Sequence, residues 1–510
     1  MNTDLIAWTV GERIALREAL VAREFSDDGK LLRGLVSWKK TNGDIGHTAV
    51  IVILDELFPF QPPKVYLDPN HQGFAAVAPS FHIEPGGTLC LYGREIMFDK
   101  SSWGNADNLI YRISKWLEET DANWPDDDDC DLERYLPKNE IFVVYDGLKL
   151  EGFNSSVTIK ESQGVVRLLP SHQTLPFLDS RVRAHHRPRA AWIADLGVVA
   201  KPLKGWDDLR LALGTQAQLI ERYVLTGLIE LFLLRYQRGS EIGVLVVQAK
   251  PSNGGIAISA CESADESLDT RKLRGRVDAE SLISETVAIV GCGAIGSAVT
   301  EILFRSGVQK LTIIDPERLR PGNVIRHVAS IENVGMKKVQ ALLERLRLIG
   351  LPTDSVQTID YAINTPGMAL NLFKTHSLVI DLTADSRTTH LLASASEESG
   401  SRFISGCLQR EGGIARVDRW PLSRSECHMD PIPYVKVVGV RERGCGDFVS
   451  LTPPSSVVAA ASLTVQVVLD QLDNRGLFPP TLFEVLRVQE DEPFRTLGRF
   501  FTRTKKGSAA

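Results

Sequence analysis

A glycine cluster after an apolar run is the first place where the sequence could do chemistry. The strand-like run 286–290 leads into a segment in which Gly291, Gly293 and Gly296 form a GxGxxG, and a helical pattern follows. Glycines let the backbone approach a phosphate closely, and amides at a helix N-terminus attract anions. The pattern predicts a nucleotide site, but alone it suits a dinucleotide dehydrogenase equally well.

Polar residues farther along favour ATP over a dinucleotide. Asp315 ends the second strand-like run, where a carboxylate can hold ribose hydroxyls. Asn323, Arg326 and Lys338 follow, and cations stabilise the charge that builds on a leaving pyrophosphate, whereas hydride transfer creates no such charge. Asp385, just past a later strand-like run, is placed to bind Mg²⁺ between the phosphates. We therefore expect ATP and Mg²⁺ as ligands.

In this order the residues resemble the adenylating domain of the ubiquitin-activating and ThiF/MoeB families, over roughly 285–472. Singly, each has an ordinary explanation, such as a surface charge or a helix cap. The resemblance implies that a carboxylate is adenylated, and that the protein forms a homodimer in which Arg274 or Arg276 reaches the partner's ATP. Some relatives carry paired CxxC zinc ligands, which this sequence lacks.

The cysteines indicate thiol chemistry and no disulfide framework. There are seven, and none forms a CxxC pair, which favours a reducing, cytoplasmic compartment. Cys292 in the glycine loop and Cys407 after an apolar strand are expected to be packing residues. The seven are Cys90, Cys130, Cys261, Cys292, Cys407, Cys427 and Cys445.

Cys445 is the expected nucleophile of the adenylating region. It lies between two glycines, close to Arg441 and Arg443 and ahead of a proline turn and the helical run 455–472. Glycines leave a sulfur open, and positive neighbours favour a reactive thiol. The placement resembles the autophagy-type activating enzyme, which implies a thioester at Cys445. Cys427 is the alternative.

The N-terminal region contains a second candidate, Cys90. A proline-rich strand exit at 58–65, the segment from Phe81 to Leu91, and Trp103 resemble the ubiquitin-conjugating fold over about 110 residues. The resemblance implies thioester exchange onto Cys90, followed by attack of an amine. The usual HisProAsn is missing, so no oxyanion-stabilising asparagine is assigned, and His82 is a candidate helper whose alternative role is structural.

Bulk properties narrow the remaining classes. The net charge of -6 gives no broad basic footprint for nucleic acid. Charged residues interrupt the N-terminal stretch, so we expect no signal peptide. They also interrupt the apolar run 219–236, which predicts a core helix at about 215–237 and no membrane span.

Changes in composition and residue pattern divide the chain into three expected domains with an overall α/β fold. Residues 1–137 suit an α+β conjugating-like domain. The acidic run 126–129 near its end is expected to be a solvated linker. Residues 138–280 suit a middle α/β domain with no recognised chemistry. Residues 281–510 alternate apolar runs with helical patterns, as in a doubly wound Rossmann-type sheet.

A conjugating domain fused to an activating domain resembles the fused enzyme of bacterial type II CBASS antiphage systems. That resemblance implies a substrate, the C-terminus of a cGAS/DncV-like nucleotidyltransferase. A free-standing ubiquitin-like protein is the alternative substrate in the same chemistry. A scaffold with degenerate enzyme folds and a dehydrogenase are alternatives of other classes.

Overall fold

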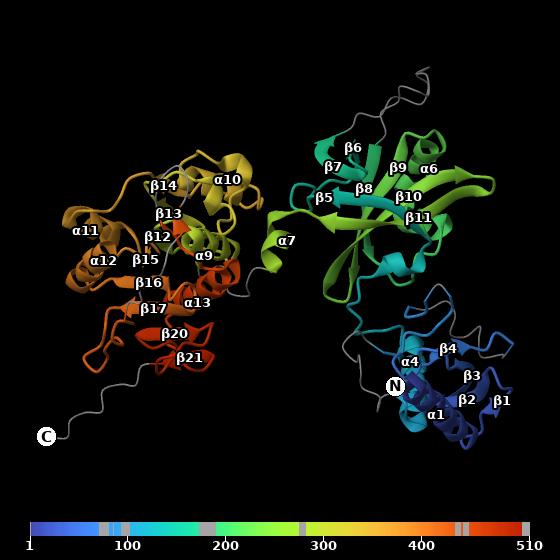
Figure 1. Cartoon of the computed structure of the whole chain (residues 1–510). Helices are drawn as coiled ribbons and strands as arrows, with labels where there is room; N and C mark the ends of the chain where they lie inside the picture. The colour runs from blue at the N-terminus through green and yellow to red at the C-terminus, as the bar shows by residue number, and fades with distance from the viewer. Residues whose placement is uncertain are drawn as a thin grey trace. The chain divides into compact units, whose positions relative to one another are not determined.

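The computed structural model divides the chain into two compact units, Met1–Ser267 and Leu268–Ala510, each drawn in Figure 1. The structure describes residues 2–70, 81–84, 86–92, 103–172, 190–274, 282–433, 440–441 and 448–501. Cys445, Arg443 and Arg276 lie outside the described residues. Both units mix helices and sheets, and the expected α/β fold class is confirmed.

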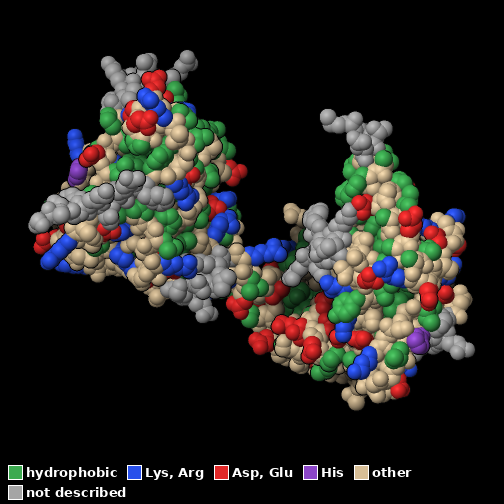
Figure 2. All heavy atoms as spheres, turned by 90° about the horizontal axis from the view of Figure 1, so that it is seen from below, with side chains coloured by type: hydrophobic (Ala, Val, Ile, Leu, Met, Phe, Trp, Pro, Cys, Tyr) green, Lys and Arg blue, Asp and Glu red, His purple; other side chains and the backbone are tan. Residues whose placement is uncertain are grey.

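Charged side chains of both signs cover the surface of each unit. In the view of Figure 2, Lys and Arg side chains are interspersed with acidic and apolar ones, and no continuous basic surface is visible on this face. Acidic side chains gather on part of the N-terminal unit.

The first half of the N-terminal unit is a small α+β layer structure. Its antiparallel sheet has the order β1-β2-β3-β4, and α1 and α4 both contact β2. Alternate residues of β2 and β3 are buried, because successive side chains of a strand point to opposite faces. The elements are α1 (Asn2–Val21), β1 (Ser26–Asp27), β2 (Leu32–Lys39), β3 (Ile45–Ile53), β4 (Lys64–Leu67) and α4 (Ala106–Asp121).

The second half of this unit is a closed barrel with the strand order β10-β11-β5-β7-β6-β8-β9. A short 3-10 helix, η2 (Leu132–Tyr135), leads into it, and α5 (Trp206–Leu213), η4 (Gly214–Gln216) and α6 (Ala217–Leu225) follow β8. The strands are β5 (Lys138–Tyr145), β6 (Ser156–Ser162), β7 (Val165–His172), β8 (Ala190–Val198), β9 (Ile229–Arg238), β10 (Glu241–Ser252) and β11 (Gly255–Asp265).

The long helix expected at 215–237 is wrong. α6 ends at Leu225, Gly227 takes a positive φ of 71°, and β9 follows at Ile229. β9 pairs with β8 on one side and β10 on the other. A residue in the left-handed region ends a helix, and an apolar run buried in a barrel has no periodicity that separates strand from helix.

The C-terminal unit is built on an eight-stranded sheet with the order β14-β13-β12-β15-β16-β17-β20-β21. The strands β14, β13, β12, β15 and β16 are parallel to one another, whereas β17, β20 and β21 join the sheet by antiparallel pairs. The strands are β12 (Thr286–Val290), β13 (Lys310–Ile314), β14 (Gln357–Ile359), β15 (Leu378–Asp381), β16 (Arg402–Gln409), β17 (Ile414–Trp420), β20 (Thr481–Val485) and β21 (Gly498–Phe501). The predicted strands in this region are confirmed, and the parallel part is the expected Rossmann-type arrangement.

Helices connect the parallel strands, and β18 (Val440–Arg441) pairs with β19 (Phe448–Val449) in a separate ribbon. The helices are α7 (Leu268–Leu273), α9 (Ala294–Arg305), η5 (Pro321–Asn323), η6 (Ile331–Asn333), α10 (Lys338–Arg347), α11 (Pro366–Thr375), α12 (Ser386–Ser399) and α13 (Pro454–Leu472).

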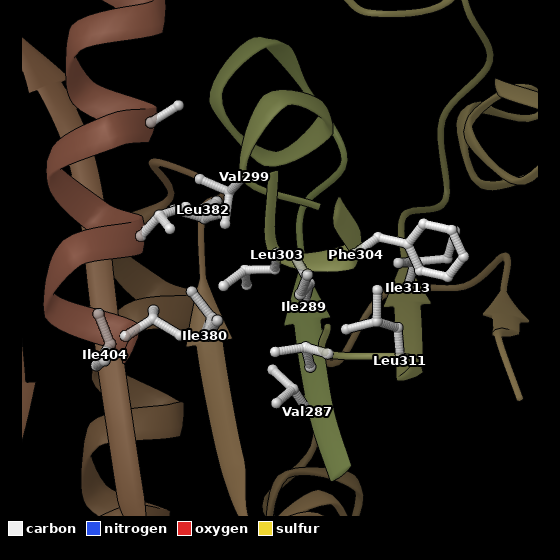
Figure 3. Close-up of a cluster of buried hydrophobic side chains, with 14 of the residues drawn as sticks. Val287, Ile289, Val299, Leu303, Phe304, Leu311, Ile313, Ile380, Leu382 and Ile404 are labelled. Atoms are coloured by element: carbon white, nitrogen blue, oxygen red, sulfur yellow. The ribbon is translucent and has the colours of Figure 1, made fainter. Parts of the chain in front are cut away.

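The core that positions the glycine loop lies between the sheet and helices α9 and α13. Figure 3 shows Val299, Leu303 and Phe304 of α9 facing side chains of the parallel strands, including Ile289 and Ile380. α13 is long and apolar enough to resemble a membrane span, but 61% of that stretch is buried inside the unit, where the helix packs on α9, β16 and β17. Because α9 packs against both the sheet and α13, the position of this helix in the unit is fixed.

Candidate active sites

The glycine loop between β12 and α9 brings the backbone close to its neighbours. A Cβ at Gly296 would lie 1.9 Å from the Gly291 carbonyl oxygen, and one at Gly291, whose φ is 92°, would meet the Thr383 backbone. A Cβ at Gly293 would meet nothing within 4 Å, and Gly293 gives α9 no side-chain cap. Open space beside helix amides fits a phosphate group.

Asp315 fastens this loop to the end of β13. Its Oδ2 accepts a hydrogen bond from the Cys292 amide at 2.8 Å, and its Oδ1 accepts one from the Glu317 amide at 2.8 Å. The side chain is predicted to hold ribose hydroxyls. In the structure it is buried and shapes the loop through two backbone amides, and each oxygen has a further lone pair to offer.

Cys292 is the packing residue that the sequence predicts. Its side chain is fully buried in the core, and burial raises the pKa of the thiol far above its ordinary value. Burial likewise raises the pKa of Cys407 to about 12. Neither thiol is available as a nucleophile at neutral pH.

His327, for which the sequence predicted no role, supports the glycine loop through a hydrogen bond to its backbone. Its Nε2 donates to the Cys292 carbonyl at 2.9 Å, and its Nδ1 accepts from the Ala329 amide at 3.0 Å. Burial first, and then the charge of Lys338, lower the pKa of His327 to about 4. The ring is a neutral support, and no sequence signal marks it because its partners are backbone groups.

Lys338, a residue predicted to bind ATP, is paired with an acidic side chain in the structure. The side chain is 9% exposed, and its Nζ forms an ion pair with Glu317, whose side chain is 67% exposed. An exposed partner can leave without a burial cost. Asn323 Oδ1 accepts from the Arg320 amide at 3.0 Å, so this predicted ATP residue also shapes its own turn.

Arg326 connects the expected ATP residues to the segment that contains Cys445. Its Nη1 donates to the Thr452 carbonyl at 3.3 Å, and Thr452 lies between β19 and α13. Arg326 is therefore a neighbour of the chain that follows Cys445 by a few positions.

Asp385 acts as a helix cap in the structure. It is the N-cap of α12, and its Oδ2 accepts from the Thr388 amide at 3.2 Å and the Thr388 hydroxyl at 2.8 Å. These hydrogen bonds lower the pKa of the carboxyl. The ionised group keeps one oxygen outside the cap, which fits a Mg²⁺ ligand whose other partners come from phosphate and water. Among the described residues, no three His, Cys, Asp or Glu side chains cluster to hold a metal.

The other candidates of this unit are less engaged with the glycine loop. Cys427 is half-buried in the segment after β17, where the neighbouring His428 donates from Nε2 to the Arg419 carbonyl at 3.1 Å. Arg274 follows α7 and is exposed. In the described part of the chain, neither Cys427 nor Arg274 forms a hydrogen bond or an ion pair with the glycine loop.

Cys90 lies in the N-terminal unit on a short extended segment beside the sheet. The Leu89 amide donates to the Val65 carbonyl at 2.7 Å, and the Cys90 amide donates to the His82 carbonyl at 2.8 Å. Leu89 and Leu91 are buried on either side, while Cys90 itself is half-buried. Trp103, part of the conjugating-fold pattern, is buried and donates to the Pro59 carbonyl at 2.9 Å.

His82 lies against Cys90 and is held by Asp127. The imidazole Nε2 bonds with Asp127 Oδ2 at 2.8 Å, and the His82 carbonyl accepts from the Cys90 amide at 2.8 Å, which places the ring beside Cys90. Burial alone would lower the pKa of His82, but the interactions with Asp127 and Cys90 outweigh it and raise the pKa to about 9. The ring is an imidazolium at neutral pH.

The expectation that 126–129 is a solvated linker is wrong for Asp127, although Asp126, Asp128 and Asp129 are exposed. Asp127 is 12% exposed and pairs with Arg238 of β9, which is 5% exposed. Asp128 Oδ1 accepts from the Ser240 amide at 3.0 Å. The run is fixed because a buried arginine from the barrel needs a carboxylate partner.

Arg134 of η2 also reaches the sulfur. Its Nη1 lies 3.9 Å from Cys90 Sγ, and its Nε donates to Asp131 Oδ2 at 2.9 Å. Sequence reasoning missed Arg134, Asp127 and Arg238, since only the packing of the barrel against the first half brings them to Cys90.

A cavity of about 800 Å³ adjoins the segment that leads to Cys90. Its walls come from the sheet, from the turn before Cys90 and from the connector into the barrel. Tyr135 lines the cavity and also accepts a hydrogen bond from the His82 amide at 2.8 Å. Other lining residues are Ile51, Ile53, Tyr66, Ile83, Leu136 and Lys204.

Residues 267–476 match the ThiF family, and the C-terminal unit therefore contains an adenylyltransferase-type domain of that family. The resemblance predicted from the glycine loop, Asp315 and the later polar residues is confirmed at this level. The N-terminal unit lies outside the matched range.

Individual proteins are similar to parts of this chain. Over 138 residues the chain is 34% identical to the ATP-dependent ubiquitin transferase-like protein Cap2 of Enterobacter hormaechei, a match that covers 27% of this chain and 23% of that protein. A longer match, 25% identical over 441 residues, joins 77% of this chain to 73% of the uncharacterized protein y4qC of Sinorhizobium fredii. The match to Cap2 spans less than a quarter of the length of that protein. The crystal structure of E. coli MccB with ATP is 17% identical, has a TM-score of 0.34, and aligns with 44% of this chain and 66% of its own.

Proposed function

We propose that the protein uses ATP to adenylate the C-terminal carboxylate of another protein and then carries the acyl group on Cys445 and Cys90 in turn. The observation that carries this proposal is the ThiF-family unit, whose glycine loop leaves space beside the free amides of α9. A thiol flanked by cationic side chains on the same chain adds the second half of the chemistry.

In the first step a carboxylate oxygen attacks the α-phosphorus of ATP, the O–P bond forms, and pyrophosphate leaves. The glycine loop binds phosphate through amides, and Asp315 holds both the loop and the ribose. Lys338 and Arg326 stabilise the negative charge that moves onto pyrophosphate. Mg²⁺, held by Asp385 when bound, would neutralise phosphate charge. Exchange of Glu317 for phosphate at Lys338 would be favourable because Glu317 is exposed.

In the second step the Cys445 thiolate attacks the acyl carbon and AMP leaves. Support comes from its flanking glycines and from Arg326, which contacts the following segment at Thr452. Cys427 is the alternative nucleophile. Cys292 and Cys407 are poor candidates, because burial raises the pKa of both thiols.

In the third step the acyl group passes from Cys445 to Cys90 by thioester exchange, and an amine of the target finally takes it from Cys90. Placing both thiols on one chain raises their effective concentration. The proposed division into a conjugating-like domain at 1–137, a middle domain at 138–280 and an adenylating domain at 281–510 serves this relay.

The proposed carrier substrate is the C-terminus of a cGAS/DncV-like nucleotidyltransferase in antiphage defence, in the cytoplasm. The relative named as an ATP-dependent ubiquitin transferase-like protein supports a protein substrate. A ubiquitin-like protein could enter the same chemistry. We also propose a homodimer, in which Arg274 or Arg276 reaches the partner's ATP.

Non-reducing gels test the relay. The full chain is incubated with ATP, Mg²⁺ and a cGAS/DncV-like nucleotidyltransferase, and thiol-sensitive adducts are mapped by mass spectrometry. We expect Cys445→Ala to remove both adducts and Cys90→Ala to remove only the second. Cys130→Ala is the matched control and should keep both. An adduct on Cys90 that persists in Cys445→Ala would reject the order of transfer.

A further inference from the structure

The Cys90 site is completed by residues from outside the conjugating-like half of the N-terminal unit. His82 contributes an imidazole that bonds with Asp127, and its carbonyl accepts from the Cys90 amide at 2.8 Å, so the ring lies beside the thiol. Asp127 belongs to the acidic run, and Arg134 of η2 places Nη1 3.9 Å from Cys90 Sγ. A thiol, an imidazole and a carboxylate in series form the arrangement that activates a cysteine nucleophile.

The barrel fixes this series. Arg238 of β9 pairs with Asp127, and its guanidinium lies 3.4 Å from the centre of the Phe81 ring. Phe81 directly precedes His82. The carboxylate and the histidine segment are therefore held by one buried cation, so His82 cannot move away from Cys90 without disturbing the barrel contact.

Other groups that face His82 set its orientation. The Tyr135 hydroxyl accepts from the His82 amide at 2.8 Å, and the Trp116 indole donates to the His82 carbonyl at 3.2 Å. The Trp124 ring lies 4.1 Å from the imidazole, centre to centre. His82 has a positive φ of 58°, which costs energy for a non-glycine residue. A strained backbone held by several partners is typical of a functional position.

We propose that His82 is the proton-transferring residue of the Cys90 site, that Arg134 stabilises charge on the sulfur, and that Asp127 and Arg238 are positioning residues supplied from the connector and the barrel. The inference rests on the proposed acyl transfer through Cys90. It gives the barrel a role, and it fills the position left by the missing HisProAsn.

At Cys90 the nitrogen of an acceptor amine attacks the acyl carbon and a C–N bond forms. The C–S bond breaks, and its electron pair goes to the sulfur. The His82 imidazolium gives its proton to the Cys90 thiolate, and the neutral ring then takes the proton that the amine loses on becoming an amide. The products are an amide, a free thiol and an imidazolium, so the site returns to its starting state.

Alkylation of the full chain by iodoacetamide tests the thiol half of the proposal. Its rate at Cys90 is followed by mass spectrometry at neutral pH. We expect His82→Gln to slow alkylation about tenfold or more, since an imidazole partner of a nucleophile contributes on that scale or above. Arg134→Gln and Asp127→Asn should slow it less. Asp128→Asn is the matched control, because Asp128 bonds to Ser240, whereas the carboxylate that bonds His82 is that of Asp127.

The titration of His82 provides a readout that general loosening would not mimic. NMR of the full chain labelled at histidine Cε1, with His82→Gln to assign the signal, should show titration near pH 9. The groups facing the ring are Asp127, Cys90, Tyr135 and, behind Asp127, Arg238. In Asp127→Asn the midpoint should move down, because the neutral amide no longer favours the imidazolium.

Either of two results would overturn the inference: an alkylation rate unchanged in His82→Gln, or a His82 midpoint unchanged in Asp127→Asn. Neither measurement uses ATP or a carrier protein. If both come out as expected while no ATP-dependent adduct forms on Cys90, the proposed function fails and the assignment of these four residues stands.

Discussion

The two candidate sites of this chain are assembled in opposite ways. The glycine loop, its helix and Asp315 come from neighbouring elements of one sheet, and their contacts follow from a strand-turn-helix order. The Cys90 site takes its parts from four segments, and the Arg238–Asp127 pair joins residues 111 positions apart. A local site can be recognised from sequence, whereas a site made by packing one half of a unit on another requires the structure.

The histidines of the two sites show the same contrast in electrostatics. His82 is held by a carboxylate, and its pKa is raised to about 9. His327 is buried against backbone groups, and its pKa is lowered to about 4. One ring is charged at neutral pH and the other is neutral, which suits proton transfer at Cys90 and passive support at the glycine loop.

Loss of the barrel's hold on the Cys90 site should have the largest effect. Arg238→Ala removes the buried arginine partner of Asp127 and leaves the His82 imidazolium beside it, and we expect the N-terminal unit to lose about 3 kcal/mol of unfolding free energy. Urea unfolding followed by hydrogen exchange of β9 measures this. Arg33→Ala is the control, because the Arg33–Asp28 pair is 45% and 47% exposed and should contribute below about 1 kcal/mol. Equal effects of the two substitutions would refute the buried-pair interpretation.

A methyl group in the glycine loop should have the next largest effect. Gly296→Ala places a Cβ against the Gly291 carbonyl, where backbone must shift, and we expect the C-terminal unit to lose about 2 kcal/mol. Gly293→Ala has open space and should leave stability unchanged while hindering the approach of phosphate. Calorimetric unfolding separates the two variants. If Gly293→Ala were the more destabilising, the described loop geometry would be incorrect.

The two histidines should give stability changes of opposite sign with pH. The folded pKa of His82 is above its unfolded value, so its contribution is full below about pH 6.5 and is lost as pH rises through about 9. The folded pKa of His327 is below its unfolded value, so stability is lost as pH falls from about 6.5 toward 4.

Unfolding of wild type, His82→Gln and His327→Gln across this pH range measures both contributions. The difference between wild type and His82→Gln should shrink on the alkaline side. For His327→Gln the change should fall on the acidic side. The same pH trend for both variants would remove the electrostatic contrast between the sites.

Asp385 should give the smallest change in stability and separates two roles of one carboxylate. Asp385→Asn keeps an N-cap oxygen and should alter unfolding by less than about 0.5 kcal/mol, whereas Asp385→Ala should cost about 1 kcal/mol. If the carboxylate also binds Mg²⁺, Asp385→Asn should still weaken Mg²⁺-dependent pyrophosphate exchange. Full exchange activity in Asp385→Asn would leave only the capping role.

Sequence alone predicted the parts whose neighbours in space are also neighbours along the chain. The strands β12, β13, β15 and β16 and the glycine loop follow from short apolar runs and a local motif. The expected helix at 215–237 failed because an apolar run buried in a barrel does not show helical or strand periodicity clearly. The acidic run 126–129 was misread because its partner, Arg238, comes from a distant strand.

The candidate residues divide along the same line. Asp315 and Lys338 lie in the unit of the glycine loop, as expected, and Cys292 packs behind it. His327 and Arg134 carried no signal, since a histidine bonded to a backbone carbonyl and a backbone amide, and an arginine near a sulfur, look like ordinary residues in a sequence. Cys445 stays a prediction.

Exchange of labelled pyrophosphate into ATP tests the central claim most directly, because it reports adenylation before any thioester forms. The full chain is assayed with a synthetic peptide that carries the C-terminal residues of a cGAS/DncV-like nucleotidyltransferase, and a ubiquitin-like tail is tested in parallel. We predict peptide-dependent exchange that survives in the Cys90→Ala/Cys445→Ala double variant and is lost in Lys338→Ala. Absence of exchange with either tail, in protein whose folding is confirmed, would contradict the account.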